Sequence, residues 1–488
     1  MALDSRMGSN GLLEAEIEWS KQSQPNVPGL SLLGAGAVLP QPDPKLNLNR
    51  QAWSQPTVFE GLTGSLRYTH ALSDQWQWSA HLGSQRLKTD DRIAFPFGCT
   101  DSNGIDYYAD RFCPNGDVDV YDFRSEGERR RKQATQFKLD GSFATGNVSH
   151  DISLGFLQSA ARVKTPDQVF NYSGSLNLAN PLLPIPASPQ PAPGTANDQR
   201  ESTRELFANH RISWSPAFKT WFGLRHTRLQ RSDALNATDY SQSFTTPWLA
   251  AAYDIQGHTL YASHGHGIES EVVASVNTLN PGQALQPKRS RQTEIGFKFN
   301  AQSLSWQATL FQISRPVTSA DACGSVGISP CNVQLDGSAE HRGFELSAQK
   351  SLGALQLGGS ATWLDAQRQG STVDPSINGR KPVNVPSHIL RLNAAYRFSQ
   401  QWQASLHASH EGRRAALPDN TISLPAWTRL DASLKWSTAT QGINTTWQLS
   451  IDNLLDKRFF KESPYQFGHA YLFPAAPRSL RLLASFAL

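Results

Sequence analysis

Long hydrophobic runs are absent from this sequence. Nowhere in its 488 residues do about 18 apolar residues follow one another, which is the length that a helix needs to cross a membrane. Hydrophobic residues make up only 39% of the chain, although aromatic residues reach 10%. The composition excludes a transmembrane helix but not a transmembrane β-barrel, whose strands carry only alternating hydrophobicity over about ten residues.

A large charge of one sign is also lacking. The chain has 45 Lys and Arg against 41 Asp and Glu, a formal net charge of +4, which gives no basis for expecting a nucleic-acid partner. No nucleophile elbow, metalloprotease helix or phosphate loop occurs in the context that such chemistry requires. We therefore expect no enzyme activity, no catalytic residue and no cofactor.

Cysteine is scarce, and the four residues form two close pairs. Cys99 lies near Cys113, and Cys323 lies near Cys331, both within Gly-, Asp- and Ser-rich stretches. Even numbers and local pairing favour two loop disulfides in an oxidising compartment. A metal site is the alternative, although neither pair has the spacing or the His partners usual for zinc.

Period-two alternation is the pattern that fills the chain. In the last twelve residues, PRSLRLLASFAL, every second residue from Leu480 to Leu488 is apolar, as expected for a strand between two different environments. Similar segments recur from end to end. We predict eighteen strands, at about 12–24, 58–72, 75–93, 117–145, 148–165, 202–215, 218–235, 243–255, 258–270, 289–301, 304–317, 331–351, 355–369, 387–399, 402–416, 427–438, 445–460 and 477–488.

The connections between these segments alternate between very short and long. Short ones, such as Ser73-Asp74 and Gly146-Asn147, hold residues that close tight hairpins, whereas 94–116 and 166–201 are long. Tryptophans gather beside the short turns, as in a membrane-interface girdle: Trp76, Trp78, Trp214, Trp221, Trp306, Trp402, Trp436 and Trp447. Stacked soluble sandwiches would not sort their loops in this way. We predict an all-β, antiparallel transmembrane barrel, in which the last strand must pair with another strand.

Five short segments carry a family resemblance. IDNLLDKRFF (451–460) is similar to a penultimate-strand signature, which Asn453, Leu454, Asp456, Lys457 and Arg458 match while phenylalanines replace the usual tyrosines. The others, in chain order, are TLYASHGHGIESE (259–271), HRGFEL (341–346), GRKPVNVPSH (379–388) and LPAWTRLDASL (424–434). Together they resemble the TonB-dependent outer-membrane receptors, in particular those for ferric siderophores.

The resemblance implies a barrel of 22 strands filled by an N-terminal plug. Neither a plug nor a TonB box is found, and the first twenty residues lack the apolar core of a signal peptide. We therefore expect residues 1–488 to be a barrel domain that lacks the plug and about four first strands. A split gene, a misplaced start and a shortened chain all fit this expectation.

The function implied is TonB-dependent uptake of a ferric siderophore across a Gram-negative outer membrane. Its expected partners are TonB, ExbB and ExbD through the missing plug, outer-membrane lipid and lipopolysaccharide, and the barrel assembly machinery. Without a plug, coupled transport by this chain alone is doubtful. The alternatives are a receptor for cobalamin, haem or saccharide, a passive porin-like barrel, and an outer-membrane enzyme.

Ligand binding in this family implies an extracellular pocket rich in aromatic and Arg side chains. An iron chelate is bulky and often anionic, so stacking and charge-assisted hydrogen bonds suit it. The loop 94–116, held by the expected Cys99–Cys113 link, fits this demand best, and a rigid surface loop is the alternative. The candidate ligand-binding residues are Trp53, Phe95, Phe97, Tyr107, Tyr108 and Arg111.

Three further clusters are weaker candidates. His264 and His266 could place two imidazoles on one strand face as metal ligands, and Asp117 with Asp119 could hold calcium. A polar barrel interior and a solvated loop edge explain these pairs more simply. The basic run Arg129, Arg130, Arg131 and Lys132 could contact lipopolysaccharide phosphates or an anionic ligand, with a solvated strand surface as the alternative.

Overall fold

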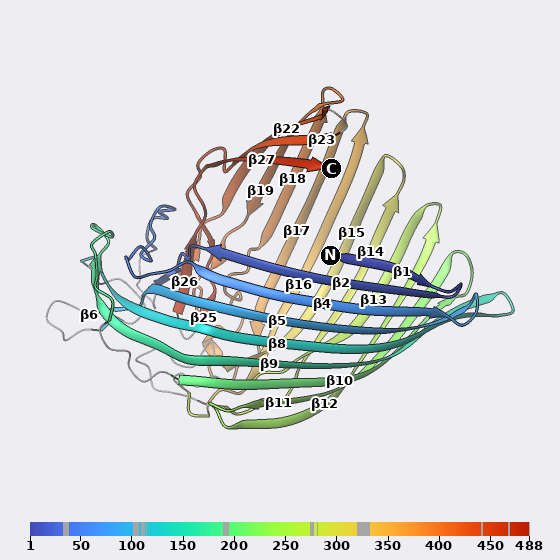
Figure 1. Cartoon of the computed structure of the whole chain (residues 1–488), viewed down its shortest axis with the longest axis horizontal. Helices are drawn as coiled ribbons and strands as arrows, with labels where there is room; N and C mark the ends of the chain where they lie inside the picture. Colours follow the sequence, from blue (N-terminus) through green and yellow to red (C-terminus); the bar gives the residue numbers. More distant parts are fainter. Residues whose placement is uncertain are drawn as a thin grey trace.

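Antiparallel strands account for most of the protein (Figure 1). The computed structural model describes residues 1–32, 39–100, 107–108, 113, 115–188, 195–273, 278–280, 282–319, 332–440, 443–466 and 469–487. Within these ranges, no helix is long and apolar enough to cross a membrane.

The main sheet contains nineteen strands, and each pairs with the next one along the chain. All of the pairings between successive strands are antiparallel. The strands are β1 (Ala2–Met7), β2 (Gly11–Gln24), β4 (Thr57–Ala71), β5 (Trp76–Pro96), β8 (Asp117–Thr145), β9 (Val148–Asn177), β10 (Thr195–Ser213), β11 (Phe218–Asp233), β12 (Thr238–Ile255), β13 (His258–Glu269), β14 (Lys288–Asn300), β15 (Leu304–Thr318), β16 (Leu335–Leu352), β17 (Leu355–Gln369), β18 (His388–Arg397), β19 (Trp402–Glu411), β22 (Trp427–Thr440), β23 (Ile443–Asp452) and β27 (Ser479–Ala487).

Each of the eighteen predicted segments contains a strand of the main sheet, and the described residues add a nineteenth strand to that sheet, so the count of eighteen is not confirmed. Within the main sheet, the additional strand is β1, which pairs with β2 across a turn at residues 8–10. Its six residues offer too short an alternation to be recognised. Gly8 at φ 69° supplies the left-handed conformation that a tight turn of this kind favours.

The predicted ring of hydrogen bonds is not completed. Among the described residues, β27 pairs only with β23 in this sheet, and β1 pairs only with β2. Figure 1 shows the sheet curling round so that β1 and β27 both lie on the side that faces the viewer. The fold is therefore a curled, open sheet of the barrel type, and the closed barrel stays a prediction.

Within the described residues, the main sheet is not closed, but a short pairing between two of its long loops connects its second strand with its last. The loop after β2 contains β3 (Leu30–Leu32), which pairs with β26 (His469–Pro474) in the loop before β27. Ser31 lies opposite Tyr471, and Leu30 lies opposite Leu472. We call this pairing the latch, because it joins loops that belong to the second strand and to the last.

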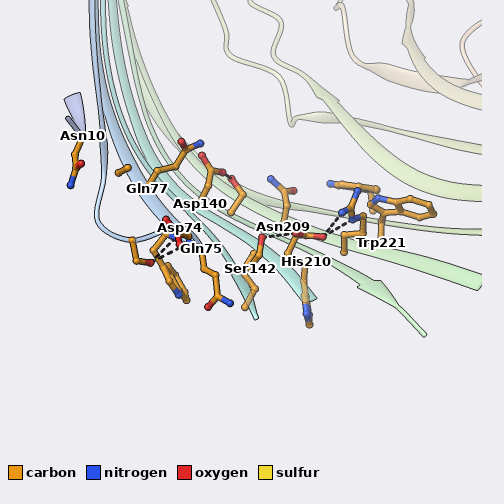
Figure 2. A pocket seen from close by; sticks show the side chains of 18 residues that line it. Asn10, Asp74, Gln75, Gln77, Asp140, Ser142, Asn209, His210 and Trp221 are labelled. Carbon is orange, nitrogen blue, oxygen red and sulfur yellow. Dashed lines mark hydrogen bonds and ion pairs between the residues drawn. The ribbon is translucent and has the colours of Figure 1, made fainter. Parts of the chain in front are cut away.

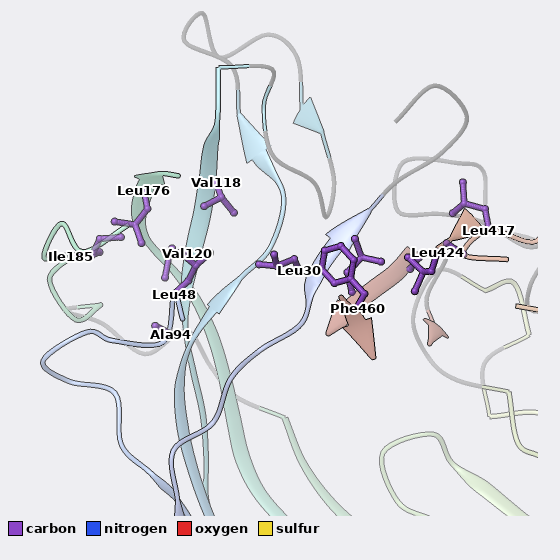
Figure 3. Close-up of a cluster of buried hydrophobic side chains, with 13 residues drawn as sticks. Leu30, Leu48, Ala94, Val118, Val120, Leu176, Ile185, Leu417, Leu424 and Phe460 are labelled. Atoms are coloured by element: carbon purple, nitrogen blue, oxygen red, sulfur yellow. The ribbon is translucent and has the colours of Figure 1, made fainter. Parts of the chain in front are cut away.

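A buried hydrophobic cluster surrounds the latch (Figure 3). Short strands from the neighbouring loops contribute to it: β21 (Ser423–Leu424) and β24 (Phe460–Glu462), with β25 (Tyr465–Gln466) packed against it. Two further members directly follow β20 (Arg414–Ala415). Its members are Leu30, Leu48, Ala94, Val118, Val120, Leu176, Ile185, Ala416, Leu417, Leu424, Phe460, Ala470 and Leu472. The largest apolar core of the described chain is thus made by loops and strand ends. It is not made by two packed sheets.

The two faces of the main sheet differ in polarity along its whole length. Residues directly opposite each other on neighbouring strands share a face, and one face carries a row of exposed apolar side chains. We call this row the apolar band; it comprises Leu66, Leu82, Phe137, Leu154, Leu206, Leu224, Leu249, Leu260, Ile295, Leu310, Leu346, Leu392, Leu406, Leu434, Leu449 and Leu482. The opposite face, called the polar face below, carries residues such as Gln136, Lys138, Asp140, Asn209 and Arg225.

Candidate functional site

Phe95 and Phe97 belong to a cluster of six aromatic rings at the long-loop ends of β5, β8 and β9. Their ring centroids lie 5.9 and 5.6 Å from that of Phe170, which stacks on Tyr121 at 4.4 Å with an interplanar angle of 5°. The cross-strand register explains this contact set, because Phe95 lies opposite Tyr121, which lies opposite Tyr172. We call Phe95, Phe97, Tyr121, Phe123, Phe170 and Tyr172 the aromatic cluster.

The aromatic cluster is partly open to solvent. Phe170 is 43% exposed and Tyr172 is 56% exposed, so their rings are available for stacking against an aromatic or amide group. Four members of the cluster were not among the residues predicted from the sequence: Tyr121, Phe123, Phe170 and Tyr172. The signal was present in VYDF (120–123) and VFNY (169–172), where aromatic residues repeat every second position, but only the register reveals that the two segments are neighbours.

Trp53 does not join the aromatic cluster. Its indole Nε1 donates a hydrogen bond to the Ile185 carbonyl at 2.9 Å, and the guanidinium of Arg92 lies 5.6 Å from the centre of its ring. Arg92 and Phe95 are three positions apart in β5, so their side chains point to opposite faces of the sheet. Trp53 therefore holds the loop after β2 against the loop after β9.

Two arginines, Arg92 and Arg124, share one buried carboxylate, and Arg92 also contacts the ring of Trp53. Asp122 is fully buried, and it accepts hydrogen bonds from Arg124 Nη2 at 2.6 Å and from Arg92 Nη2 at 3.2 Å. Burial acts to raise the pKa of Asp122, but the hydrogen bonds from Arg124 and Arg92 outweigh it and leave that pKa below its usual value. The three groups together carry one net positive charge, so they form a cationic spot at the loop end of β8.

The Cys99–Cys113 disulfide is present, with the two Cα atoms 5.6 Å apart. It lies beside the small hairpin of β6 (Cys99–Thr100) and β7 (Tyr107–Tyr108), in which Cys99 is opposite Tyr108. The backbone of β7 is described, whereas the side chains of its two tyrosines are not. Three predicted site residues, Arg111, Cys323 and Cys331, lie outside the described residues.

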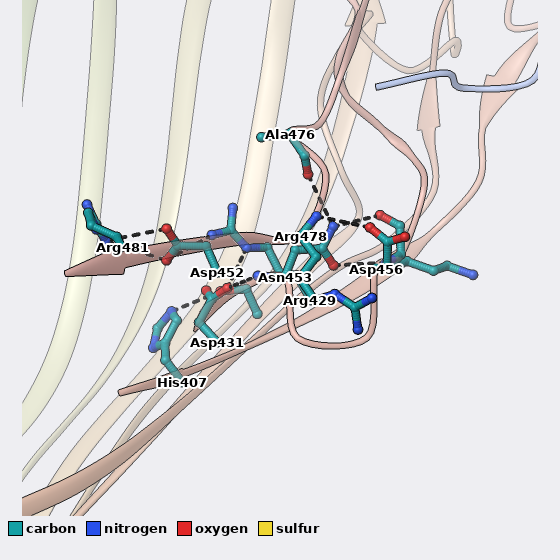
Figure 4. A network of polar contacts seen from close by, with 11 residues as sticks. His407, Arg429, Asp431, Asp452, Asn453, Asp456, Ala476, Arg478 and Arg481 are labelled. Carbon is teal, nitrogen blue, oxygen red and sulfur yellow. Dashed lines mark hydrogen bonds and ion pairs between the residues drawn. The ribbon is translucent and has the colours of Figure 1, made fainter. Parts of the chain in front are cut away.

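Residues of the 453–458 signature join several segments of the chain through hydrogen bonds (Figure 4). Asn453 is 1% exposed, and its side-chain Nδ2 donates to the carbonyls of Lys457 at 3.0 Å and Ala476 at 3.1 Å. Its backbone N–H donates to Asp431 Oδ1 at 2.7 Å. Asp456 accepts a hydrogen bond from the backbone of Arg478 at 3.0 Å. These contacts fix the chain where it leaves β23 and where it enters β27.

The other signature residues contribute less through their side chains. Leu454 bonds through its backbone N–H to the Leu430 carbonyl at 2.7 Å, and the Lys457 backbone N–H donates to Asn453 Oδ1 at 2.9 Å. Arg458 is exposed. The signature thus positions the last hairpin.

A hollow of about 760 Å³ lies on the polar side of the sheet near the short turns (Figure 2). Arg211 pairs there with Asp151 at 2.5 Å, and Asp151 also accepts a hydrogen bond from Ser142 at 2.7 Å. Trp221 lines this hollow and lies opposite Arg211 in the register. Its place in an aromatic girdle is therefore wrong, since the strand alternation turns it to the polar face.

Among the described residues, no further side chain joins either of the two weaker candidate metal sites to make a group of three ligands. The rings of His264 and His266 lie 5.3 Å apart, and His264 Nδ1 is hydrogen-bonded with Thr293 Oγ1 at 2.7 Å. Asp119 accepts a hydrogen bond from Ser175 Oγ at 2.6 Å, and Asp117 accepts one from Asn177 Nδ2 at 2.7 Å. Over the described ranges, no group of three or more His, Cys, Asp or Glu side chains is placed to hold a metal ion.

Two receptors of known name are similar in sequence to this chain. The ferrichrome receptor FcuA of Yersinia enterocolitica is 25% identical over 522 aligned residues, covering 99% of this chain and 63% of that receptor. The ferrioxamine B receptor of Salmonella typhimurium is 22% identical, covering 69% of this chain and 48% of that receptor. The chain thus spans less than two thirds of the length of either relative.

A solved structure also superposes on the fold. The ferric preacinetobactin receptor BauA of Acinetobacter baumannii matches with a TM-score of 0.83 at 21% identity, covering 99% of this chain and 71% of that one. The family model described as "TonB dependent receptor-like, beta-barrel" matches residues 3–454. Because this match includes most of the nineteen strands and the first part of the 453–458 signature, the chain belongs to the TonB-dependent receptor β-barrel family.

Proposed function

We propose that this chain forms the barrel of an outer-membrane receptor that takes up a ferric siderophore with energy delivered through TonB. The observation that carries the proposal is the family match over residues 3–454. The names of the relatives, which are receptors for ferrichrome and ferrioxamine B, support the ligand class. In this reading, the apolar band contacts lipid and the polar face lines the interior.

The aromatic cluster is the proposed contact surface for the chelate. Its exposed rings, Phe170 and Tyr172, suit stacking on aromatic or amide groups. The cationic spot of Arg92, Arg124 and Asp122 lies on the other face of the sheet, because Arg92 and Phe95 are three positions apart in β5, and it is therefore not part of this surface. Binding, and not a reaction, is the role of the aromatic cluster.

Energy coupling is proposed to come from a plug domain that contacts TonB, ExbB and ExbD. The matched family model is that of the β-barrel, so the assignment of residues 1–488 to a barrel domain without a plug stays a prediction. Ferric siderophore is the cargo in this proposal, and no resident cofactor is invoked.

Binding and uptake by intact cells test the proposal. The chain is expressed in a Gram-negative strain without siderophore receptors, with and without TonB, and ⁵⁵Fe-loaded ferrichrome, ferrioxamine B and an aryl siderophore are offered. We expect saturable binding of one of them, and a loss of about tenfold in affinity for Phe170→Ala/Tyr172→Ala. Tyr253→Ala, an exposed aromatic near the opposite end of the sheet, is the control. Binding of cobalamin, haem or saccharide instead, or TonB-independent conductance in planar bilayers, would contradict the proposal.

A further inference from the structure

Two half-buried histidines face each other across β18 and β19, at the long-loop end of both strands. The Nε2 atoms of His388 and His410 are 3.2 Å apart, and their ring centres are 5.2 Å apart with an interplanar angle of 20°. His388 precedes Leu392 of the apolar band by four positions. His410 follows Leu406 of that band by four positions, so the even spacing keeps both histidines on the apolar-band face. We call these two residues the histidine pair.

The second nitrogen of each ring is held by a hydroxyl group. His388 Nδ1 is hydrogen-bonded with Ser387 Oγ at 3.1 Å, and His410 Nδ1 is hydrogen-bonded with Thr428 Oγ1 at 2.8 Å. When each Nδ1–H donates to its hydroxyl, the two Nε2 atoms present lone pairs to each other, and only a proton or a metal ion can bridge them. Histidines that bind metals are oriented in this way, by a partner on the nitrogen that faces away from the metal.

The backbone of β19 leaves room for the ring of His388. A Cβ at Gly412 would lie 2.6 Å from Cε1 and 2.7 Å from Nδ1 of that ring, so any larger residue at this position would displace the imidazole. The Gly412 N–H also donates a hydrogen bond to the His388 carbonyl at 2.9 Å. Glycine at this position thus allows the two rings to approach each other.

The surroundings of the histidine pair are uncharged in the register of the sheet. Trp363 lies opposite His388, and Leu390 and Thr428 lie opposite His410. Among the residues that the structure describes, no Asp, Glu or Cys side chain joins the pair in a group of three. Neutral imidazole donors suit Zn²⁺, Cu²⁺ and Ni²⁺, whereas Ca²⁺ and Mg²⁺ require oxygen ligands.

The separation of the two Nε2 atoms fits a shared metal ion. Two nitrogens that each lie about 2.0–2.1 Å from one tetrahedral zinc ion are about 3.3 Å apart, and the centres of their rings are about 5 Å apart. The corresponding distances in the histidine pair are 3.2 and 5.2 Å. The two rings are therefore placed to chelate one ion without rearrangement.

We propose that the histidine pair binds a divalent first-row transition metal ion, Cu²⁺ or Zn²⁺, which joins β18 to β19 at the long-loop edge of the apolar band. Water fills the remaining ligand positions, so the ion exchanges with the medium. Both imidazoles bind in the neutral form, and protonation at acid pH releases the ion. This site lies outside the aromatic cluster, and the inference does not depend on which ligand the chain carries.

A second pair of histidines supplies a matched control. His150 Nδ1 and His210 Nε2 are 3.1 Å apart, near the short-turn ends of β9 and β10. Their spacing of four from Leu154 and from Leu206 places them on the apolar-band face as well. The ring of Phe143 stacks on His150 with the two centres 4.7 Å apart, so packing against a phenylalanine accounts for the position of that imidazole.

The test measures Cu²⁺ binding by the full chain, purified without a histidine tag, in neutral detergent micelles near neutral pH. Cu²⁺ is the probe because nitrogen sites bind it most tightly among these ions. We expect one saturable equivalent, displaced by excess Zn²⁺, with a pulsed EPR signal from two coordinated imidazoles. Heat-dependent electrophoretic mobility checks that every variant is folded.

The variants separate the histidine pair from the other imidazoles. His388→Ala and His410→Ala should each weaken the binding of this equivalent by about hundredfold, because chelation by two linked ligands is lost. The EPR signal of either variant should then report a single imidazole. His150→Ala/His210→Ala should keep both the affinity and the signal of the unaltered chain.

The hydroxyl on His410 tests the positioning of the ring. Thr428→Val keeps both histidines and should weaken Cu²⁺ binding by about tenfold, whereas Thr428→Ser should restore it. Unchanged affinity in Thr428→Val would contradict the role given to this hydroxyl group.

Three results would overturn the proposal. The first is the absence of saturable Cu²⁺ binding by the unaltered chain, which would leave a proton as the only bridge between the rings. The second is an EPR signal from one imidazole in the unaltered chain. The third is an equal loss of affinity in His150→Ala/His210→Ala. No siderophore is present in these measurements, so failure of the proposed function is distinguishable from failure of this inference.

Discussion

At the scale of single residues, the buried polar groups at the long-loop end carry the strongest constraints. Asn453 combines a left-handed backbone, φ 54°, with side-chain hydrogen bonds to the backbone of two segments. Asparagine tolerates this conformation better than most residues, and its amide offers both donors and an acceptor. Few other residues meet both demands, which gives a physical reason for asparagine in this signature.

Replacing Asn453 by Ala should lower the free energy of unfolding by about 2–4 kcal/mol, because buried partners lose their hydrogen bonds and a strained conformation loses its preferred residue. Asn453→Gly relieves the strain alone and should cost less. Urea unfolding of the refolded chain in detergent measures both. Leu455→Ala, at a side chain that is 67% exposed, is the control, and an equal loss there would contradict the assigned role.

Asp122, the sixth residue of β8 from its long-loop end, should make the stability of the folded chain depend on pH. Its pKa in the folded chain lies below its ordinary value of 3.8. A depressed carboxyl pKa contributes stability that is present above the unfolded-state pKa and is lost as pH falls through the folded-state pKa. The stabilisation by Asp122 should therefore be constant from neutral pH down to about pH 5 and should vanish at lower pH.

Asp122→Asn tests this expectation. Near neutral pH, the variant should lose about 2–4 kcal/mol, since Arg92 and Arg124 keep their charges without a partner. The difference from the unaltered chain should shrink below about pH 4. Urea unfolding at a series of pH values gives the curve, with Asp74→Asn in an exposed turn as the reference. A difference that stays constant to low pH would refute the assignment.

At the scale of elements, the latch is the feature that local sequence patterns could not reveal. The strands of the main sheet are long, alternate regularly and meet their sequence neighbours, so their positions could be predicted. β3 has three residues, and its partner β26 lies more than 400 residues away. Nothing local distinguishes such a segment from loop.

The residues of the candidate site could likewise be predicted only where a local sequence signal marked them. Phe95 and Phe97 were found because they flank an expected disulfide, whereas Phe170 and Tyr172 lie on a strand whose register was unknown. Trp53 was grouped with them by composition alone, and its indole instead bonds to the Ile185 carbonyl.

A disulfide across the latch tests the pairing directly. Ser31 and Tyr471 are opposite each other in antiparallel strands, within the separation that a disulfide spans. Ser31→Cys/Tyr471→Cys should form a cross-link under mild oxidation, visible as a mobility shift in non-reducing gels that reductant removes. Ser31→Cys/Tyr253→Cys, which places the second thiol near a short turn, should not cross-link. Equal yields in both variants would argue against the latch.

At the scale of the whole molecule, the two faces of the sheet should respond oppositely to charge. Leu406 belongs to the apolar band, and its neighbour His407 lies opposite Asp431 on the polar face. Leu406→Arg should cost about 2–4 kcal/mol in lipid bilayers, because an arginine on the lipid side is poorly solvated. His407→Arg should cost little.

Unfolding in phospholipid vesicles compares these two variants, and the same comparison in water-soluble detergent shows how much of the effect belongs to the bilayer. Equal costs for Leu406→Arg and His407→Arg in vesicles would mean that the apolar band does not face lipid. A cost confined to His407→Arg would reverse the assignment of inside and outside.

The strictly antiparallel order of the main sheet has an arithmetical consequence. Since eighteen reversals separate the first strand from the nineteenth, β1 and β27 run in the same direction. If β1 and β27 paired directly with each other, theirs would be the only parallel pairing in an otherwise antiparallel barrel. A closed barrel in which every pairing is antiparallel must contain an even number of strands. The nineteen strands can therefore belong to such a barrel only together with an odd number of further strands, such as one or three.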